Sequence, residues 1–160
     1  MARAKQGLER FRDLARNRRA FHEFEILERL EAGIVLTGSE VKGLRGRGAT
    51  LRDAYAQFRD GEAWLVGLHI ADWDQPGLVP HDPRRTRKLL LHRSEIDSWA
   101  RQVAEKGLTV VPLRLYFKDG RAKVELGLAR GKAAYDKRRA IAERDARREM
   151  DRAIKAVRRR

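Results

Sequence analysis

The chemistry that this sequence offers most clearly is the binding of phosphate groups by clustered arginine and lysine side chains. The run from Arg84 to Lys88 holds four cations in five residues and precedes the leucines 89–91. In an extended strand successive side chains point to opposite faces, so Arg85 and Arg87 share one face. One face of the run can then meet phosphates while the leucines anchor the strand. On its own, the run fits ordinary solvated surface charge equally well.

Lys42, Arg45 and Arg47 form a second basic group, which lies among glycines. Because glycine has no side chain, the backbone there can approach a phosphate chain closely. Residues 43–46 also match the GXXG loop of KH domains, but the strand-rich sequence around them does not fit that fold. We therefore expect Lys42 and Arg45 to lie near a phosphate backbone without forming a KH loop.

Motifs of enzymes and metal sites are weak in this sequence. Residues 127–132 resemble a phosphate loop, but three residues instead of four separate the glycines, and an alanine stands where Ser or Thr would bind magnesium. The chain has no cysteine, and no histidine has a second histidine four residues away. A nuclease would need a histidine beside a carboxylate. Two pairs could converge, His22 with Glu31 and His81 with Asp82, but nothing in their spacing favours it. We expect no catalytic activity, no metal and no cofactor.

The basic surplus lies at the two ends of the chain. The formal net charge is +14, of which residues 1–20 carry +5 and residues 130–160 carry +8. Residues 21–129 contain 17 basic and 16 acidic side chains, the balance of an ordinary soluble domain. Basic ends on a near-neutral body indicate a polyanion gripped by the termini, and nucleic acid is the commonest such partner. A membrane surface fits less well, because the ends have almost no Trp, Phe or Leu to insert.

The length of 160 residues leaves room for one domain. The first 17 residues are charged throughout and lack the apolar stretch of a signal peptide. The apolar runs, such as residues 89–91, are far too short to span a membrane. The absence of cysteine also fits a reducing compartment. We expect a soluble protein of the cytoplasm.

Two Asp-Gly dipeptides, Asp60-Gly61 and Asp119-Gly120, predict β-hairpins because glycine accepts the positive φ of a tight turn. The expected strands of these hairpins are residues 54–58, 63–70, 109–117 and 121–128. A further strand pair is expected at 21–30 and 33–36, separated by a turn. A loop at 73–83 holds three of the four prolines.

Two helices are expected between the strands. Thr37 and Glu40 have the spacing of a capping box, which predicts a helix from Ser39 to about Arg45 that the following glycines stop. A second helix is expected from Ser94, which can cap it, to Gly107, which can end it. Its apolar stripe consists of Ile96, Trp99 and Val103.

These elements favour a mainly β fold: a small antiparallel barrel, closed or partly open, of the oligonucleotide-binding kind, with short flanking helices. We place the barrel body at 21–132, between a basic N-terminal segment at 1–20 and a basic C-terminal tail at 133–160. The tail has high helix propensity, but its apolar stripe is narrow and mostly alanine. We expect it to be disordered alone and helical on RNA. The alternative is a solvated helix packed on the barrel.

Several segments of the sequence together resemble the small protein B family. They occur in the order that the family has, span about residues 17–148, and are Glu31 to Lys42, Asp60 to Ala63, His81 to Leu91, Leu115 to Gly120, Gly127 to Lys132 and Asp136 to Arg138. Each segment alone is a weak signal, whereas six in register make coincidence implausible. The sequence departs from the family at Ala133, where lysine is common, and in a tail that is rich in arginine instead of lysine.

The resemblance implies an RNA-binding adaptor of bacterial translation. Members of the family bind the tRNA-like domain of transfer-messenger RNA and deliver it to stalled ribosomes for trans-translation, with elongation factor Tu in the delivery complex. The body would stand in for the missing anticodon arm, and the tail would enter the decoding centre and the message channel. Composition alone leaves open a general basic protein associated with the ribosome or the nucleoid.

The resemblance also implies, by position, two groups of functional residues. The expected RNA-binding face consists of Asn17, His22, Glu31, Lys42, Arg45, Arg87, Lys88, Leu91, Lys123, Gly131 and Lys132. The expected decoding-centre group consists of Tyr135, Asp136, Lys137 and Arg138. Glu31 is unusual because a carboxylate repels phosphate. We expect it to accept a hydrogen bond from a base or a 2′-hydroxyl, or to orient a neighbouring arginine.

Overall fold

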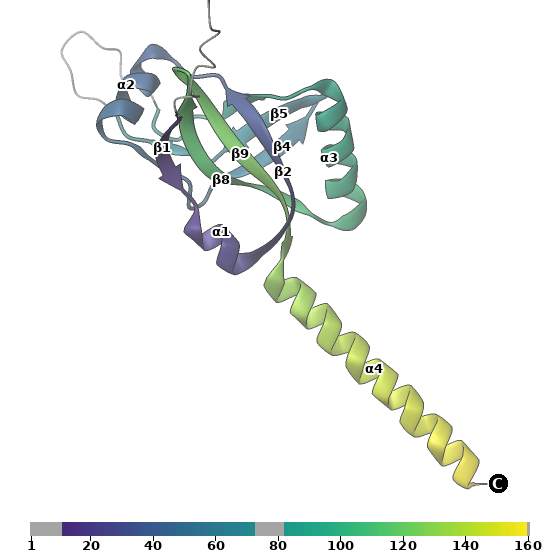
Figure 1. Cartoon of the computed structure of the whole chain (residues 1–160). Coiled ribbons are helices and arrows are strands. Elements are labelled where there is room, and N and C mark those ends of the chain that lie inside the picture. The colour runs from purple at the N-terminus through teal and green to yellow at the C-terminus, as the bar shows by residue number, and fades with distance from the viewer. Residues whose placement is uncertain (1–10, 73–81, 160) are drawn as a thin grey trace, which may run out of the picture.

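Strands and short helices alternate along the chain and lead into one long C-terminal helix (Figure 1). The structure, a computed structural model, describes residues 11–72 and 82–159, without the side chains of 133–136. The strands are β1 (Phe11–Arg16), β2 (Phe24–Ile34), β3 (Ala49–Thr50), β4 (Tyr55–Arg59), β5 (Glu62–Val66), β6 (His69–Ile70), β7 (Arg87–Leu90), β8 (Thr109–Lys118) and β9 (Arg121–Gly131). The helices are α1 (Arg18–Glu23), α2 (Gly38–Gly46), α3 (Arg93–Lys106) and α4 (Lys132–Arg158). Most of the expected proline loop, at 73–83, lies outside the described residues.

An antiparallel sheet organises the body, so the predicted mainly β class with flanking helices is confirmed. β8 and β9 form a hairpin, and β2 pairs with nearly the whole of β9. β7 lies between β2 and β5, and β5 pairs with β4. β1 pairs with the second half of β8, while β4 meets the first half at one residue pair, Ala56 with Val110.

Both predicted hairpins are confirmed, at Asp60-Gly61 and at Asp119-Gly120. All four turn residues have positive φ, from 50° to 79°, as such tight turns require. The first hairpin is shorter than expected, because β5 ends at Val66 and Gly67 turns away with a φ of 82°. A Cβ on Gly67 would lie 2.7 Å from the backbone oxygen of Asp53, so a side chain has no room there. The chain then leaves the large sheet, and β6 pairs with β3.

The strand pair expected at 21–30 and 33–36 is wrong in its boundaries. Residues 18–23 form the helix α1 because Asn17 caps it, its Oδ1 accepting a hydrogen bond from the N–H of Ala20 at 3.2 Å. The turn expected before residue 33 is absent from this stretch, since β2 continues to Ile34 with β9 beside it. The sequence of residues 31–33 favours a turn, but pairing with β9 keeps them in an extended strand.

The predicted capping box of α2 is present. Thr37 Oγ1 accepts a hydrogen bond from the N–H of Glu40 at 3.4 Å, and Glu40 Oε1 accepts one from the N–H of Thr37 at 2.9 Å. The prediction that Ser94 caps α3 is wrong, because α3 begins at Arg93 and the N–H of His92 donates to Glu95 Oε1 at 3.0 Å. Gly107 ends α3 in the left-handed conformation, as predicted.

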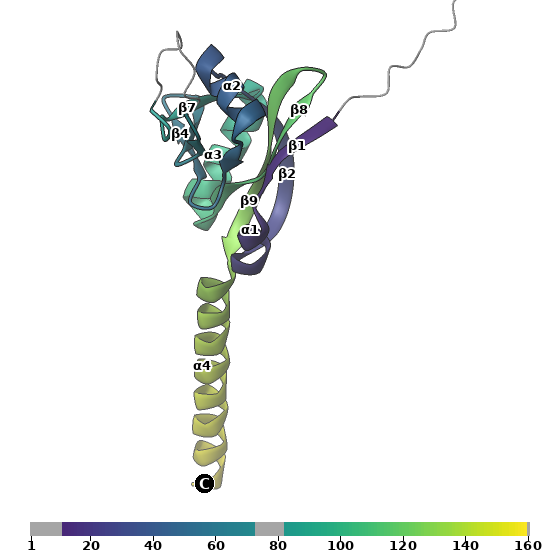
Figure 2. The same ribbon diagram turned by 90° about the vertical axis from the view of Figure 1, so that its left-hand side faces the viewer.

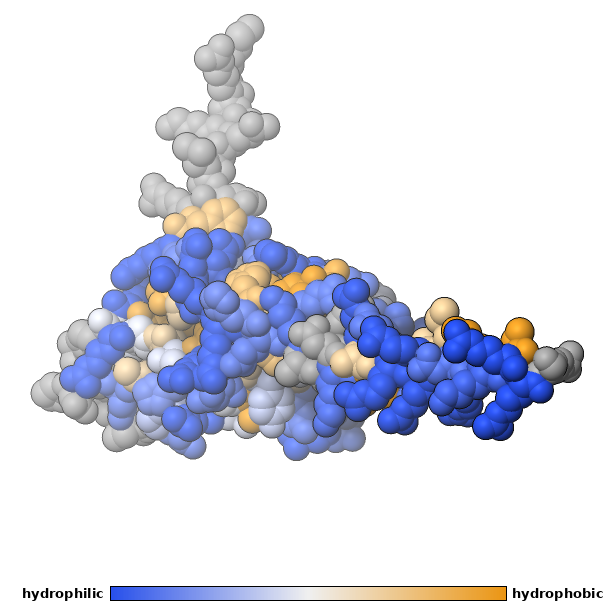
Figure 3. Space-filling model, turned by 90° about the horizontal axis from the view of Figure 1, so that it is seen from below, coloured by the Kyte–Doolittle hydropathy of each residue, from blue (hydrophilic) through white to orange (hydrophobic). Residues whose placement is uncertain are grey.

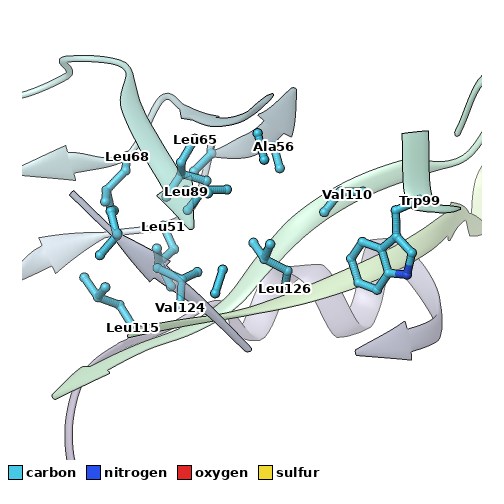
Figure 4. Close-up of a cluster of buried hydrophobic side chains, with 14 of the residues drawn as sticks. Leu51, Ala56, Leu65, Leu68, Leu89, Trp99, Val110, Leu115, Val124 and Leu126 are labelled. Atoms are coloured by element: carbon cyan, nitrogen blue, oxygen red, sulfur yellow. The ribbon is translucent and has the colours of Figure 1, made fainter. Parts of the chain in front are cut away.

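The hydrophobic core lies between the two hairpins and α3 (Figure 4). Leu65, Leu115 and Leu126 come from β5, β8 and β9 and are fully buried. Trp99 of α3 is also buried, and its Nε1 donates to Glu28 at 2.9 Å. Burying each large apolar side chain contributes about 1.5–3 kcal/mol. Among the residues whose side chains the structure describes, the buried apolar ones lie between positions 20 and 129.

A buried ion pair joins α2 to β7. The side chains of Glu40 and Arg87 are inaccessible to solvent, and Arg87 Nε donates to Glu40 Oε2. Arg87 also donates to the backbone oxygens of Leu68 at 2.7 Å and Pro83 at 3.1 Å, while Arg85 donates to Glu40 Oε1 at 2.6 Å. Arg85 and Arg87 share one face, as predicted. That face is directed at a carboxylate inside the protein and not at phosphates outside it.

The two ends of the body differ from the expected boundaries. The sheet already includes β1, which pairs with β8 from Phe11 opposite Lys118 to Arg16 opposite Arg114, ten residues before the expected start at 21. At the other end, α4 projects from β9 as a single helix (Figures 1 and 2). The tail is therefore helical, and its described side chains from Lys137 onward are exposed. None of the described helices is both long and apolar enough to cross a membrane.

We predict that Glu40→Gln lowers the free energy of unfolding by about 3 kcal/mol, because it leaves Arg87 buried without its counter-charge. Urea denaturation measures the change. Glu62→Gln is the matched control: Glu62 pairs with Lys88 at 3.1 Å, but both side chains are more than 40% exposed. An exposed pair contributes less than about 1 kcal/mol. Equal losses in the two variants would contradict the special role of the buried pair.

Candidate nucleic-acid interface

His22, Gly131 and Lys132 come together where α1 meets the end of β9. Gly131 lies opposite Phe24 in the sheet, directly after α1, and His22 is exposed on that helix. Lys132 is exposed, and its Nζ donates to the backbone oxygen of Phe21 at 2.9 Å. Two of these side chains thus face solvent at the root of α4, where a polyanion can reach both.

Asn17 belongs to the expected RNA-binding face, but the structure places it inside. Its side chain is 6% exposed, and besides capping α1 its Nδ2 donates to the backbone oxygen of Pro112 at 2.9 Å. The backbone N–H of Asn17 donates to Leu113 at 2.9 Å. The polar atoms of this side chain already bond to the protein, and its direct contact with RNA stays a prediction. Asn17 holds α1 against β8.

Lys42 and Arg45 lie on α2, where both are exposed. The guanidinium of Arg45 lies 5.5 Å from the centroid of the Phe117 ring, which fixes the side chain through a cation–π contact. Beside it, a groove between α2 and the β8–β9 turn includes Val41 and Lys123. Phe117 also lines this groove, so Arg45 and Lys123 belong to one part of the surface.

Lys88 and Leu91 share a groove beside the start of α3, which Arg93 and Ile96 also line. Lys88 is half-exposed and pairs with Glu62. Arg87, its neighbour in the strand, has no exposed surface, since Glu40 and two carbonyl groups take up its guanidinium. Arg87 holds β7 and α2 together, and its direct contact with RNA stays a prediction.

Glu31 lies on the outer face of the sheet among cations. Its carboxylate accepts a hydrogen bond from the Tyr116 hydroxyl and lies 3.5 Å from Lys118 Nζ. The hydrogen bond from Tyr116 lowers the pKa of Glu31 below its ordinary value of 4.5. Burial acts in the opposite direction, and the positive charges of Lys118 and Lys123 lower the pKa further. Burial and the bond to Glu31 raise the pKa of Tyr116. Glu31 thus orients Tyr116 and Lys118. From the sequence, we expected it to orient an arginine.

The decoding-centre group lies on the first turns of α4. Lys137 and Arg138 are exposed on the helix. The side chains of Tyr135 and Asp136 lie outside the described part of the structure. Farther along, apolar side chains show along one edge of the helix among basic ones (Figure 3), and those exposed are Ile141, Met150, Ile154 and Val157.

Comparison with known proteins identifies the family. The model of a family described as "SmpB protein" matches residues 14–156. The chain belongs to the SmpB family. Two relatives named SsrA-binding protein are 58% identical over 139 residues, in Parafrankia sp. (strain EAN1pec), and 53% identical over 142 residues, in Sulfurihydrogenibium sp. (strain YO3AOP1). These alignments cover 87% and 89% of this chain, and 88% and 93% of the relatives.

A solved structure supports the same family. Its description is "tmRNA-SmpB: a journey to the center of the bacterial ribosome". One of its chains is 50% identical to this SmpB family member, with a TM-score of 0.64. The match covers 76% of this chain and 85% of that one. Sequence and fold therefore agree on the assignment.

Sequence reasoning missed the polar network on the outer face of the sheet of this SmpB family member. Arg114 lies 3.5 Å from Asp13 and 4.3 Å from the ring centroid of Tyr116. Alternation along β8 does place Arg114, Tyr116 and Lys118 on one face, but the carboxylates that meet them come from β1, β2 and β9. Among the described residues, no three His, Asp or Glu side chains gather as a metal site would require.

We predict that Tyr116→Phe raises the pKa of Glu31 toward 4.5, because it removes the hydrogen bond that most strongly favours the carboxylate. NMR titration of the Glu31 side chain measures the shift. A carboxylate with a lowered pKa adds stability that is lost as pH falls through the folded value, so the variant should also lose less stability in acid. Tyr55→Phe, at an exposed tyrosine on β4, is the control. An unmoved Glu31 pKa would contradict the assignment.

Proposed function

We propose that this protein binds the tRNA-like domain of transfer-messenger RNA, which is SsrA RNA, and delivers it to stalled ribosomes for trans-translation. The observation that carries the proposal is the 50% identity to a chain of the tmRNA-SmpB structure over three quarters of this chain. The SsrA-binding relatives add support, since each is matched over almost its whole length. The protein acts as a cytoplasmic adaptor without catalysis, and elongation factor Tu is part of the delivery complex.

The body of the protein selects the RNA in this proposal. The residues that face solvent and make the contacts are His22, Lys42, Arg45, Lys88, Leu91, Lys123, Gly131 and Lys132. Asn17 and Arg87 position them from inside, and Glu31 holds the buried Tyr116 and the partly exposed Lys118. The pairing of strands supports a partly open barrel of the oligonucleotide-binding kind as the platform. Its weak seam is the single residue pair between β4 and β8.

The tail engages the ribosome in this proposal. With 27 residues, α4 extends about 40 Å from the body, at 1.5 Å per residue. Tyr135, Asp136, Lys137 and Arg138 enter the decoding centre, and the rest follows the message channel. Arginine binds phosphate with two donors in a fixed plane, so an arginine-rich helix suits ribosomal RNA.

We predict that a chain ending at Ala133 keeps its affinity for the tRNA-like domain within about threefold but loses peptide tagging on stalled ribosomes. All the buried apolar residues that the structure describes lie at or before position 129, so the shortened body keeps them. Filter binding measures RNA affinity, with a duplex of equal length as competitor, and a reconstituted translation system measures tagging. Parallel loss of both activities would contradict the division between body and tail. Equal affinity for the duplex would favour a general basic nucleic-acid-binding protein.

We predict that Lys88→Ala weakens binding of the tRNA-like domain and lowers the slope of log affinity against log salt by about one phosphate contact. The side chain of Lys88 is 41% exposed, and its Nζ donates to Glu62. Titrations at several salt concentrations measure the slope. Lys106→Ala, at an exposed lysine at the end of α3, is the control. A slope that equals the control's would remove Lys88 from the interface.

A further inference from the structure

A basic hollow, absent from the expected sites, lies between α1 and the outer face of the sheet. The side chains that line it come from β1, α1, β2, β8 and β9, and the polar and aromatic ones are Arg16, Arg18, Phe21, Arg29, Arg114 and Glu125. Only the folded sheet brings these residues together, because nearly a hundred positions separate Arg18 from Arg114. Four guanidinium groups in one concave site form a surface suited to an anion.

The carboxylates around this basic hollow neutralise only part of its charge. Asp13 lies 2.6 Å from Arg16 and 3.5 Å from Arg114. Glu125 lies 3.3 Å from Arg29 and 3.8 Å from Arg114. Two carboxylates therefore face four arginines, and the structure records no side-chain partner for the exposed Arg18 among the residues it describes. Two positive charges remain for a ligand.

An exposed aromatic ring at the edge of the basic hollow adds a second kind of contact. Phe21 is 43% exposed, although neighbouring apolar residues of α1 and β8 are buried. The guanidinium of Arg29 lies 5.5 Å from the centroid of its ring and holds the ring in place. Unpaired bases stack on such rings while cations nearby meet the phosphates. The combination suits a single-stranded nucleic acid better than an acidic peptide.

We propose that the basic hollow binds an unpaired segment of transfer-messenger RNA, with its phosphates on Arg18 and Arg29 and one base stacked on Phe21. This inference rests on the proposed function. The hollow adjoins the root of α4, because Lys132 Nζ donates to the carbonyl of Phe21 itself. One RNA strand can therefore contact the hollow and the surface formed by His22 and Lys132. This continuity with the body is the reason for choosing transfer-messenger RNA over ribosomal RNA.

The test compares substitutions in the full chain by their affinity for the tRNA-like domain over a series of salt concentrations. Arg18→Ala should lower the salt slope by about 0.7, the value for one phosphate of a single strand. Phe21→Leu should weaken binding about 5- to 100-fold, whereas Phe21→Tyr, which keeps the ring, should bind like the unchanged protein. Arg101→Ala, at an exposed arginine on α3, is the control for lost charge.

Glu125→Gln distinguishes loss of a contact from loss of folding. The change removes a negative charge that competes with phosphate for Arg29 and Arg114, so it should tighten binding about 2- to 5-fold at low salt. Misfolding cannot produce tighter binding. Weaker or unchanged affinity in this variant would count against the basic hollow as a phosphate site.

The possible failures are separable. If the unchanged protein does not prefer the tRNA-like domain over duplex, the proposed function fails and the inference with it. If the preference holds but Arg18→Ala and Phe21→Leu bind like Arg101→Ala, the basic hollow is not an RNA site and the proposed function stands. If these two variants bind the free RNA normally and lose affinity only for ribosomes, ribosomal RNA is the occupant and the inference is overturned.

Discussion

The buried ion pair between Glu40 and Arg87 is the constraint on which the candidate RNA surface depends. Glu40 caps the first turn of α2, accepts hydrogen bonds from Arg85 and Arg87, and so ties the helix to β7. The position of Arg45 relative to the sheet follows from that link. Burial raises the pKa of Glu40, but the bonds from Arg85, Thr37 and Arg87 outweigh it and lower the pKa overall. The lowered pKa favours the charged carboxylate, which balances the buried guanidinium of Arg87.

Positioning and contact are separate tasks in this protein, although both use polar residues of the same motifs. Arg87 lies next to Lys88 in one strand, yet the first is fully buried and the second is half-exposed. Asn17 lies next to Arg18 in the same way, with the amide inside and the cation outside. A motif that marks an RNA-binding protein thus includes residues that are buried in the folded protein. These buried residues fix the positions of the neighbouring cations, Arg18 and Lys88.

The parts of the fold that local chemistry decides were predictable from the sequence. Both Asp-Gly hairpins, the capping box at Thr37 and the glycine end of α3 depend on a few adjacent residues, and all are present. The helix α1 has a local cap at Asn17 that the sequence analysis missed. The inclusion of β1 in the sheet and the burial of Arg87 were not predictable, because partners far along the chain decide them. The basic hollow was not predicted for the same reason. Its arginines come together only when the strands of the sheet, β1, β2, β8 and β9, pair.

The direct passage from β9 into α4 has a mechanical consequence. The strand ends at Gly131 and the helix begins at Lys132, so no loop separates the two. Because β9 belongs to the sheet, a rotation of the sheet turns α4 with it. A rotation of the body by about 10° would displace the far end of a 40 Å helix by roughly 7 Å, more than one helical turn. The angle at which RNA seats the body would therefore decide where the tip of the tail arrives.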